Sequence, residues 1–369
     1  MKVLKIIHTQ GHGGAENAFR WLAQGLRQDG VDVFAAIPEQ HDQQCKSWIA
    51  SALDEVEIPF LTFDKRGSPM QLFCNISTLI GRVRPDIVHS HLLDSNFYTS
   101  MVCRKNGVPH VCTEHGDLLF IRSATAGIKY KAISLCSSMV VCVSAAVRKK
   151  AEIMIPARKL ATISNGISFF NSRPSEFRAQ AGITAKSMVI GNVGNLYPVK
   201  GQKFLIEAFA RLLAFHPDSR LVLVGRGSED ENLKILVRKL GIAEGMVIFT
   251  GFRNDIEDIV NSFNLYIQPS LSEGHPLAVL EAMSAGIPVI ASAVGGIPEL
   301  FNREQYGTLA TSGSSESLYA RLLEFVCQPE VFLAKALAAR EHVLETFSIA
   351  RMSRKYIEVY EQAIAVKSS

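Results

Sequence analysis

Residues 270–299 read SLSEGHPLAVLEAMSAGIPVIASAVGGIPE, and this stretch predicts a strand end, a loop, a helix and a second strand. The first strand covers 264–270, and the loop after it holds Glu273. Pro276 suits the first turn of a helix, because its fixed φ is helical and its missing N–H would have no partner there. Gly286 is typical of a helix end before the next strand. The loop therefore lies at the carboxyl end of a strand in an α/β unit.

Two glutamates lie around the N-terminus of the predicted helix. Glu273 falls in the loop, and Glu281 lies about a turn and a half into the helix. The helix N-terminus offers unpaired N–H groups and a partial charge of about half a unit, which favour phosphate. Carboxylates accept hydrogen bonds from hydroxyl groups. The combination fits a sugar nucleotide, although a solvated glutamate on an ordinary α/β helix gives the same residues.

The spacing of these residues is similar to a known motif. S-E-G-x-P-L-x-x-L-E-A-M-x-A-G-x-P-V-I-A-S-x-x-G-G-x-P-E, at 272–299, resembles the donor-binding signature of retaining glycosyltransferases of family 4. The resemblance implies the GT-B fold, an α/β architecture of two doubly wound, Rossmann-like domains that face each other across a cleft. It also implies that Glu273 reaches hydroxyls of the donor sugar and that Glu281 accepts both ribose hydroxyls. The residues that would assist Glu273 in binding the donor are Gly274, His275, Pro276 and Leu277.

Length and composition indicate a globular protein of two domains. The 369 residues exceed what one core usually serves, and 47% hydrophobic with 20% charged residues is an ordinary globular composition. Seven cysteines without a C-x-x-C pair argue against a disulfide framework or zinc site and for a reducing compartment. No run approaches the roughly 18 apolar residues of a membrane span. We therefore expect a cytoplasmic protein, soluble or peripheral on the inner face of the cytoplasmic membrane.

Basic residues are concentrated in the first half of the chain. Residues 1–180 carry 21 Lys and Arg against 15 Asp and Glu, whereas residues 181–369 carry 18 against 20. A solvated face explains this excess, and so does a patch that rests on anionic lipid or steers an anionic acceptor. We expect no nucleic-acid partner, since aromatic residues are not interleaved with these charges. The residues concerned are Lys129, Lys131, Arg148, Lys149, Lys150 and Arg158.

Strand-like apolar runs alternate with helical patterns along the chain, which predicts parallel sheets covered on both faces. The periodicity lapses over 168–184, which we interpret as the connection between an acceptor-side domain at 1–168 and a donor domain at 169–349. The pattern F-S-x-x-x-M-x-x-x-Y-x-x-x-Y at 347–360 resembles the crossover of the GT-B fold, which assigns a last helix at about 350–369 to the first domain. The predicted strands are 2–9, 31–37, 60–63, 86–91, 110–115, 139–144, 160–166, 188–194, 220–225, 246–251, 264–270, 288–294 and 307–311.

The first turn between a strand and a helix is rich in glycine. It reads HTQGHGGAEN over 8–17 and leads into a helix at about 15–30. Such glycines let backbone N–H groups approach an anion, and they also form plain turns. A dinucleotide fingerprint does not fit, because Glu16 replaces the third glycine. The segment G-G-A-E resembles a loop of family 4, in which Gly13 and Gly14 would approach the donor's diphosphate or sugar and Glu16 would face the acceptor.

Three histidines follow two strands of the first half. His89 and His91 end D-I-V-H-S-H at 86–91, and His115 follows V-C-T-E. A histidine at a strand end is often structural; the alternative for His89 and His91 is contact with the acceptor. The resemblance gives His115 a catalytic role, because a histidine after this strand contacts the donor sugar in the family. It also implies no metal site, since the family holds the diphosphate without metal.

The second half opens with a cationic motif. I-G-N-V-G-N-L-Y-P-V-K-G, residues 190–201, follows a strand and precedes a helix, so that Lys200 can reach phosphate oxygens. It resembles V-G-R-L-x-P-x-K-G of the family, in which the arginine and lysine neutralise the leaving nucleoside diphosphate. Lys200 matches, whereas Asn195 stands where the arginine is usual. Arg226, after the next strand, is our candidate for the missing charge.

Two further loops complete the predicted donor site. In V-I-F-T-G-F-R-N-D at 247–255, the resemblance places the backbone of Phe252 and Arg253 against the base, although a plain turn fits equally. His275 occupies a position of the motif at which members of the resembled family commonly have an aromatic or apolar residue. It is therefore either a residue that bears on sugar choice or an exposed loop residue without a role.

These motifs predict a retaining, metal-independent glycosyltransferase that needs no cofactor. Its donor is a nucleoside-diphosphate sugar, with UDP-sugar favoured over GDP-sugar. Its acceptor is a glycan or lipid-linked hydroxyl in bacterial cell-surface polysaccharide or lipopolysaccharide synthesis. The expected catalytic residues are His115, Lys200 and Glu273, and Lys200 would stabilise the departing diphosphate. The resemblance to family 4 implies that the acceptor attacks from the front face. Two alternatives stay open: a sugar-nucleotide epimerase of the same fold, and a non-catalytic sugar-nucleotide-binding subunit, which Asn195 supports.

Overall fold

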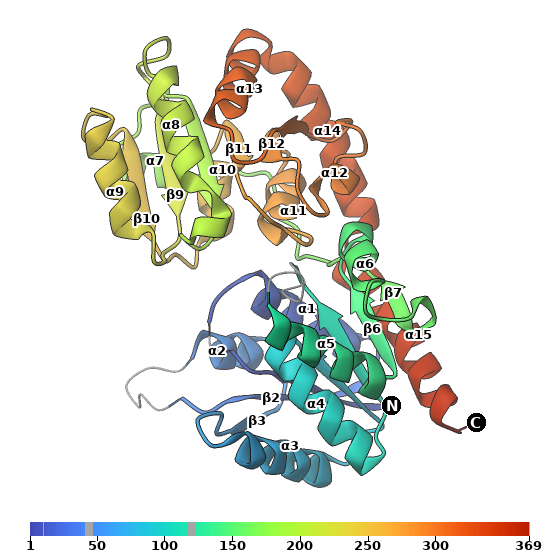
Figure 1. Ribbon diagram of the computed structural model, residues 1–369. Helices are drawn as coiled ribbons and strands as arrows, with labels where there is room; N and C mark the ends of the chain where they lie inside the picture. Colours follow the sequence, from blue (N-terminus) through green and yellow to red (C-terminus); the bar gives the residue numbers. More distant parts are fainter. Residues whose placement is uncertain (10, 41–46, 117–122, 369) are drawn as a thin grey trace. The chain divides into compact units, whose positions relative to one another are not determined.

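The computed structural model describes residues 1–9, 11–40, 47–116 and 123–368. The chain divides into two compact units (Figure 1). Unit 1 comprises Met1–Ile167 and Phe347–Ser369, and unit 2 comprises Ser168–Thr346. Each unit contains one parallel sheet with helices on its faces. The expectation of two doubly wound, Rossmann-like domains is confirmed, whereas the acceptor and donor roles of the two units stay predictions.

Unit 1 has a seven-stranded parallel sheet in the order β3-β2-β1-β4-β5-β6-β7. Its central strands are buried on both faces; β1 and β6 are mainly apolar, whereas β4 and β5 also carry buried polar side chains. The order reverses between β1 and β4, and the ends of these two strands flank the place where open α/β sheets bind ligands. The strands are β1 (Lys2–Ile7), β2 (Asp32–Pro38), β3 (Phe60–Phe63), β4 (Ile87–His91), β5 (His110–Glu114), β6 (Met139–Cys142) and β7 (Leu160–Thr162).

Three of the described helices of unit 1 begin at serine caps that the sequence provides. Ser47, Ser68 and Ser144 each accept a hydrogen bond from a first-turn N–H, and Pro69 occupies the first turn of α3. The helices are α1 (Gly14–Gln28), α2 (Trp48–Glu55), α3 (Pro69–Val83), α4 (Leu93–Asn106), α5 (Ala124–Cys136), α6 (Ala145–Ala151), the 3₁₀ turn η2 (Ala157–Lys159) and the C-terminal α15 (Ile349–Ser368).

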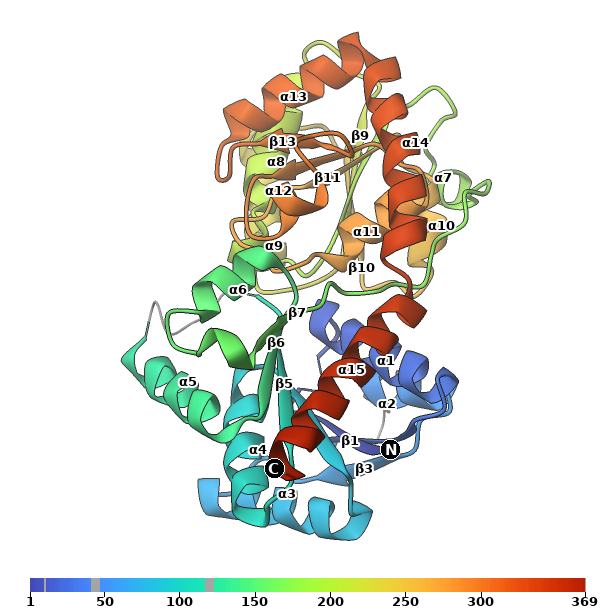
Figure 2. The same cartoon turned by 90° about the vertical axis from the view of Figure 1, so that its right-hand side faces the viewer.

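Helix α15 packs against α1 of unit 1 (Figure 2). Gly25 of α1 allows the close approach, because a Cβ there would lie 2.7 Å from Ile349 Cγ2 and 2.9 Å from Ser353 Cβ. The Ser353 hydroxyl also donates to the Asp29 carboxylate. The end of the chain is therefore an integral layer of unit 1.

Unit 2 has a six-stranded parallel sheet in the order β10-β9-β8-β11-β12-β13. The order reverses between β8 and β11, so that the loops after these two strands flank a second switch point. The strands are β8 (Val189–Val193), β9 (Arg220–Val224), β10 (Val247–Gly251), β11 (Leu265–Gln268), β12 (Val289–Ser292) and β13 (Thr308–Ala310).

Helices α8 and α13 pack on the sheet of unit 2 and share an apolar core with its strands. Leu205 and Phe209 of α8 share this core with Leu318 and Leu322 of α13. The helices are α7 (Phe177–Gln180), the 3₁₀ turn η3 (Pro198–Lys200), α8 (Gln202–Leu212), α9 (Asp230–Lys239), α10 (Ile256–Asn261), α11 (Leu277–Ser284), α12 (Ile297–Leu300), α13 (Ser315–Cys327) and α14 (Pro329–Thr346). None of the helices in the described part of the chain is both long and apolar enough to cross a membrane.

Residues 168–184, which the sequence indicates as the connection to the second domain and which fall almost wholly within the predicted range 169–349, are part of unit 2. The segment contains α7 and buries Phe177. Its backbone is held by side chains of α10: the Asn171 N–H donates to Glu257 Oε1 at 2.8 Å, and the Phe177 N–H donates to Asp258 Oδ2 at 3.2 Å. The sequence could not reveal this anchoring, because the partners are more than 80 residues away.

Six histidines, among them His89 and His91, have pKa values far below the ordinary value, chiefly because burial penalises the charged form. The pKa is lowered to about 3 for His110 and His115 and to about 4 for His8 and His275. Between pH 6.5 and these values only the unfolded chain takes up protons, so stability falls as the pH falls below 6.5. Glu114 acts in the opposite sense: burial raises its pKa to about 7, and the stability it contributes is lost as the pH rises through 7.

We predict that acid destabilises the protein below pH 6.5. From pH 6.5 to about 5.5, each of the six histidines should remove about 1 kcal/mol of unfolding free energy, and Glu114 should offset about one of them. Thermal unfolding followed by circular dichroism at constant ionic strength would measure the effect. An unfolding temperature that stays constant over this interval would contradict the buried, neutral state of these histidines.

Candidate functional site

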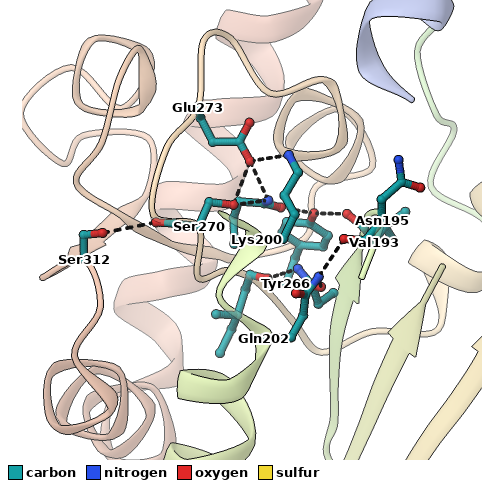
Figure 3. A network of polar contacts seen from close by, with 11 residues as sticks. Val193, Asn195, Lys200, Gln202, Tyr266, Ser270, Glu273 and Ser312 are labelled. Atoms are coloured by element: carbon teal, nitrogen blue, oxygen red, sulfur yellow. Dashed lines mark hydrogen bonds and ion pairs between the residues drawn. The ribbon is translucent and has the colours of Figure 1, made fainter. Parts of the chain in front are cut away.

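The site in unit 2 is centred on the carboxylate of Glu273 (Figure 3). Lys200 Nζ donates to its Oε1 at 2.7 Å. Gln268 Nε2 and Ser270 Oγ donate to the same oxygen at 2.9 and 2.7 Å. The Glu273 side chain is only 8% exposed, so these groups replace water as its donors. The second oxygen, Oε2, has no hydrogen-bond partner among the described residues and is available to a ligand hydroxyl.

Strand β11 presents two of these donors through its alternation. Tyr266, Gln268 and Ser270 are spaced two residues apart and therefore lie on one face of the strand and its extension. The Tyr266 hydroxyl contacts Gln268 Oε1 at 2.6 Å, which turns the amide nitrogen of Gln268 toward Glu273. The sequence analysis missed these three residues. Polar side chains at period two at the end of a buried strand are the signal that could have found them.

Lys200 reaches Glu273 because two loops of unit 2 approach closely. It is followed by Gly201, whose φ is +65° and whose Cβ, if present, would lie 2.2 Å from the Pro269 oxygen. Only glycine permits this contact between the loops after β8 and β11. The predicted ammonium and the predicted carboxylate are thus brought together at the switch point of the sheet.

A glycine also holds the backbone of the Glu273 loop. Gly295 has a φ of +54°, and a Cβ there would lie 1.6 Å from the Glu273 carbonyl oxygen. The Gly296 N–H donates to the Gly274 carbonyl at 3.1 Å. Gly295 and Gly296, which follow β12, therefore pack directly against the backbone of the loop that carries the Glu273 carboxylate.

Helix α11 begins one residue later than expected, with Pro276 as its N-cap and Leu277 as its first residue. Proline offers no side-chain acceptor, and the structure has no side-chain cap at this helix. The first-turn N–H groups are therefore left for a ligand or water. Glu281 lies half-buried on this helix. His275 is only 6% exposed, which excludes the alternative of an exposed loop histidine, and burial lowers its pKa to about 4.

The loops after β8 and β9 are joined by their backbones. The Gly194 N–H donates to the Val224 carbonyl at 2.9 Å, and the Leu196 N–H donates to the Arg226 carbonyl at 3.0 Å. A Cβ at Gly227 would lie 2.2 Å from the Leu196 oxygen, so the G-R-G sequence around Arg226 is required by this close approach.

Arg226 therefore lies in the loop directly beside Asn195, the position where the family usually has arginine. Its side chain is exposed, with its guanidinium carbon 5.2 Å from the centre of the Phe252 ring. Arg253 differs, because its guanidinium pairs with Asp255 at 2.8 Å between Nε and Oδ1. Of the two predicted arginines, Arg226 is the one whose charge is not matched by a carboxylate in the described residues.

The glycine-rich loop of unit 1 leads into α1. Gly13 is the N-cap in an extended conformation, and Gly14 is the first helical residue, without a side-chain cap. The Thr9 hydroxyl donates to Glu16 Oε1 at 2.9 Å and accepts the Gly11 N–H at 3.0 Å. Glu16 is 8% exposed, so this carboxylate braces its own loop in addition to any contact with an acceptor.

Of the two alternatives for His89, a structural role and contact with the acceptor, its contacts favour the structural one. It has no exposed surface, and both ring nitrogens are hydrogen-bonded inside unit 1. Nδ1 contacts the Tyr360 hydroxyl at 2.6 Å, and Nε2 contacts the Thr113 hydroxyl at 2.8 Å. The imidazole has no ring nitrogen left for a ligand, and it serves to dock α15.

His91 and His115 form a pair at the carboxyl ends of β4 and β5. His91 Nδ1 lies 2.8 Å from His115 Nε2, and the two rings are stacked at 5.1 Å. Burial is the main reason that both have lowered pKa values, to about 3 for His115, so the pair is neutral near pH 7. His91 is fully buried, whereas His115 is half-buried. No group of three or more His, Cys, Asp or Glu in the described residues is arranged to hold a metal ion.

Two family models match the chain. The model of Glycosyl transferases group 1 matches residues 174–340, and that of Glycosyltransferase Family 4 matches residues 12–169. An uncharacterized glycosyltransferase of Haemophilus influenzae is 31% identical over 340 residues, which cover 89% of this chain and 91% of that protein. The UDP-Gal:alpha-D-GlcNAc-diphosphoundecaprenol alpha-1,3-galactosyltransferase of Escherichia coli is 26% identical over 314 residues, or 81% of each chain.

Solved structures show the same fold. Alr3699/HepE of Anabaena, in complex with UDP-glucose, matches 98% of this chain and 99% of its own with a TM-score of 0.88 and 23% identity. Sucrose-phosphate synthase of Thermosynechococcus elongatus matches 99% of this chain and 100% of its own with a TM-score of 0.83 and 19% identity. At these identities the likeness is one of fold.

We predict that Gly295→Ala destabilises unit 2 more than a matched glycine substitution. The left-handed φ alone costs a residue with a Cβ about 1 kcal/mol, and the clash with the Glu273 carbonyl adds to this cost. Gly241→Ala is the control, because its φ is +67° and nothing lies within 4 Å of its Cβ. Thermal unfolding should show that Gly295→Ala loses at least twice as much unfolding free energy as Gly241→Ala. Equal losses would contradict the close contact between residue 295 and the Glu273 carbonyl.

Proposed function

Because the chain belongs to the glycosyltransferases of family 4, which have the GT-B fold, we propose that it transfers a sugar from a nucleoside-diphosphate sugar to an acceptor hydroxyl with retention of configuration. The observation that carries the proposal is the contact between Lys200 and Glu273 at the switch point of the unit 2 sheet. An ammonium beside a carboxylate suits a ligand that has both phosphate and hydroxyl groups.

In the proposed donor complex, Lys200 serves two partners at once. Its ammonium has three N–H donors, and Glu273 takes one of them at 2.7 Å, which leaves others for the diphosphate. The uncapped first turn of α11, with Leu277 at its start, adds N–H groups and a positive helix end. Glu273 Oε2 accepts a hydroxyl of the sugar, and Glu281 accepts the ribose hydroxyls. The diphosphate is held by these groups without a metal ion.

The reaction proceeds by departure of the nucleoside diphosphate and attack of the acceptor from the same face. Lys200 and the start of α11 stabilise the negative charge on the leaving group, where such preorganised groups have their largest effect. His115 contacts the donor sugar as a neutral imidazole, because its pKa is lowered to about 3 by burial. A neutral ring can orient the sugar without placing a positive charge near a carbon that itself becomes positive.

Named relatives support UDP-sugar as the donor and a lipid-linked or glycan acceptor. The Escherichia coli relative uses UDP-Gal and acts on a sugar diphosphoundecaprenol, and the Anabaena protein was crystallised with UDP and with UDP-glucose. We propose UDP-sugar over GDP-sugar, and a place in bacterial cell-surface polysaccharide or lipopolysaccharide synthesis.

Asn195 favours one rival, a non-catalytic subunit that binds sugar nucleotide. An asparagine at this position removes a charge that would stabilise the leaving group. Such a subunit would bind the donor and never release nucleoside diphosphate. A sugar-nucleotide epimerase of the same fold would instead change the sugar without any acceptor. Product analysis with the donor alone separates the three.

The donor site is tested by thermal stability with a panel of UDP-, GDP-, ADP- and TDP-sugars. A ligand at about 100 times its dissociation constant adds about 2.7 kcal/mol of stability. We expect UDP-sugars to raise the unfolding temperature. This increase should be abolished in Glu281→Ala and preserved in Glu244→Ala, because Glu244 is exposed elsewhere in unit 2. The absence of a shift with every sugar nucleotide would refute the donor site.

Arg226 is predicted to supply the charge that Asn195 lacks. Arg226→Ala should slow release of nucleoside diphosphate from the donor by about 10²–10³-fold, the usual cost of one group at a developing anion. Adding Asn195→Arg to this variant should restore part of the rate, because the two loops are joined. Arg238→Ala, an exposed arginine of α9, is the control. Unchanged turnover in Arg226→Ala would show that this arginine has no part in the reaction.

A further inference from the structure

His91, at the end of β4, is a buried imidazole with one ring nitrogen engaged and the other unused. The residue is 1% exposed, and its Nδ1 lies 2.8 Å from Nε2 of His115. Its own Nε2 is buried too and has no hydrogen-bond partner among the described residues. This burial favours an action through His115 over a direct contact of His91 with a ligand.

The surroundings of His91 are already engaged or apolar. Helices α1 and α15 cover this face of the sheet (Figure 2). The His91 ring stands edge-on to the ring of Phe19, with the two centres 5.1 Å apart. The His89 ring, at 4.2 Å, uses both nitrogens in hydrogen bonds to hydroxyl groups. Lys5 lies beside His89 in the register of β1 and β4, and its Nζ donates to the Phe19 carbonyl at 2.9 Å.

The contact between His91 and His115 has two possible states, because each ring is neutral. Burial lowers both pKa values, and a neutral imidazole carries its proton on one nitrogen only. In the first state, Nδ1 of His91 donates to Nε2 of His115, and the buried Nε2 of His91 is an unused acceptor. In the second state, His115 donates from Nε2, and His91 carries an N–H group on its buried Nε2.

The second state is the costlier one. Its buried N–H group has no acceptor among the described residues, and folded proteins leave buried N–H donors without a partner more rarely than buried acceptors. The first state therefore prevails, with His91 as the donor of the pair.

We propose that His91 is a positioning residue that fixes the tautomer of His115. Because Nε2 of His115 accepts from His91, the proton of His115 is on Nδ1, which has no partner in the described part of the chain. His115 then presents an N–H donor to a ligand and binds an oxygen atom that accepts a hydrogen bond. The inference rests on the proposed function for the identity of that oxygen, a hydroxyl or ring oxygen of the donor sugar. The tautomer itself is a property of unit 1.

Nitrogen NMR of the protein without ligand tests the tautomer. With ¹⁵N-labelled histidine, correlations between the ring nitrogens and the carbon-bound ring protons distinguish a protonated nitrogen from an unprotonated one. Near neutral pH, His115 should carry its proton on Nδ1, although free histidine in water prefers the proton on Nε2. The variant His115→Asn assigns the signals of this ring by their loss.

Substitutions of His91 separate positioning from packing. His91→Asn places an amide where Nδ1 lies and can still donate to His115, whereas His91→Gln places its amide where Nε2 lies. Glutamine is closer to histidine in size, so a packing role alone would favour His91→Gln. We expect His91→Asn to retain the Nδ1 tautomer and most of the turnover. His91→Gln and His91→Leu should slow release of nucleoside diphosphate by about 10–100-fold, the usual effect of removing a partner that orients a functional histidine.

His110→Leu is the matched control. His110 is also 1% exposed, and its ring is hydrogen-bonded at both nitrogens to serine hydroxyls. The control should lose stability, as His91→Leu does, yet leave the ¹⁵N signals of His115 and the turnover unchanged. Circular dichroism defines a temperature at which every variant is folded.

Three results would overturn the proposal: a proton on Nε2 of His115 in the unchanged protein, signals of His115 that change no more in His91→Leu than in His110→Leu, or turnover in His91→Gln that equals that in His91→Asn. The expected tautomer without release of nucleoside diphosphate from any sugar nucleotide would refute the proposed function alone.

Discussion

A single carboxylate oxygen, Oε1 of Glu273, organises the unit 2 site. A nearly buried carboxylate is costly unless donors replace its water, and three donors converge on this oxygen. Lys200 comes from the loop after β8, while Gln268 and Ser270 belong to β11 and its extension. The carboxylate therefore ties together the two strand ends at which the order of the sheet reverses. Ligand-binding groups are positioned by the same contacts that make burial of the charge tolerable.

Close contacts between backbones are the second constraint on this site. At Gly201, Gly225, Gly227 and Gly295, a Cβ would lie within about 2 Å of a carbonyl oxygen in a neighbouring loop. Loops that approach so closely leave little room for their ends to shift. The ammonium of Lys200 and the carboxylate of Glu273 are consequently preorganised, which is the condition for strong electrostatic effects on a leaving group.

In unit 1, buried and neutral histidines form the polar contacts at the ends of two strands. His89 bonds to Tyr360 of α15, and His91 bonds to His115 at the edge of the sheet. Burial lowers the pKa of each of these three imidazole rings. The histidines are therefore neutral and add no positive charge at the carboxyl ends of β4 and β5. His89 serves the packing of the chain end, whereas His115 pairs with His91 and remains half-buried. Histidines at the ends of two neighbouring strands thus differ in their partners and in their exposure.

The sequence by itself was sufficient to predict the succession of strands and helices along the chain and the two doubly wound units. It also predicted that Lys200 and Glu273 follow the ends of strands. These features are encoded locally, in apolar runs, glycines and prolines. The tertiary structure alone decided which polar groups meet: the partner of His89 is 271 residues away, and the tie between Lys200 and Glu273 spans 73. It also revealed that Tyr266, Gln268 and Ser270 support Glu273, and that side chains of α10 hold the backbone of the segment after residue 168. Hydrogen bonds between distant residues leave no local pattern, because they depend on how the elements pack and not on what precedes or follows each residue.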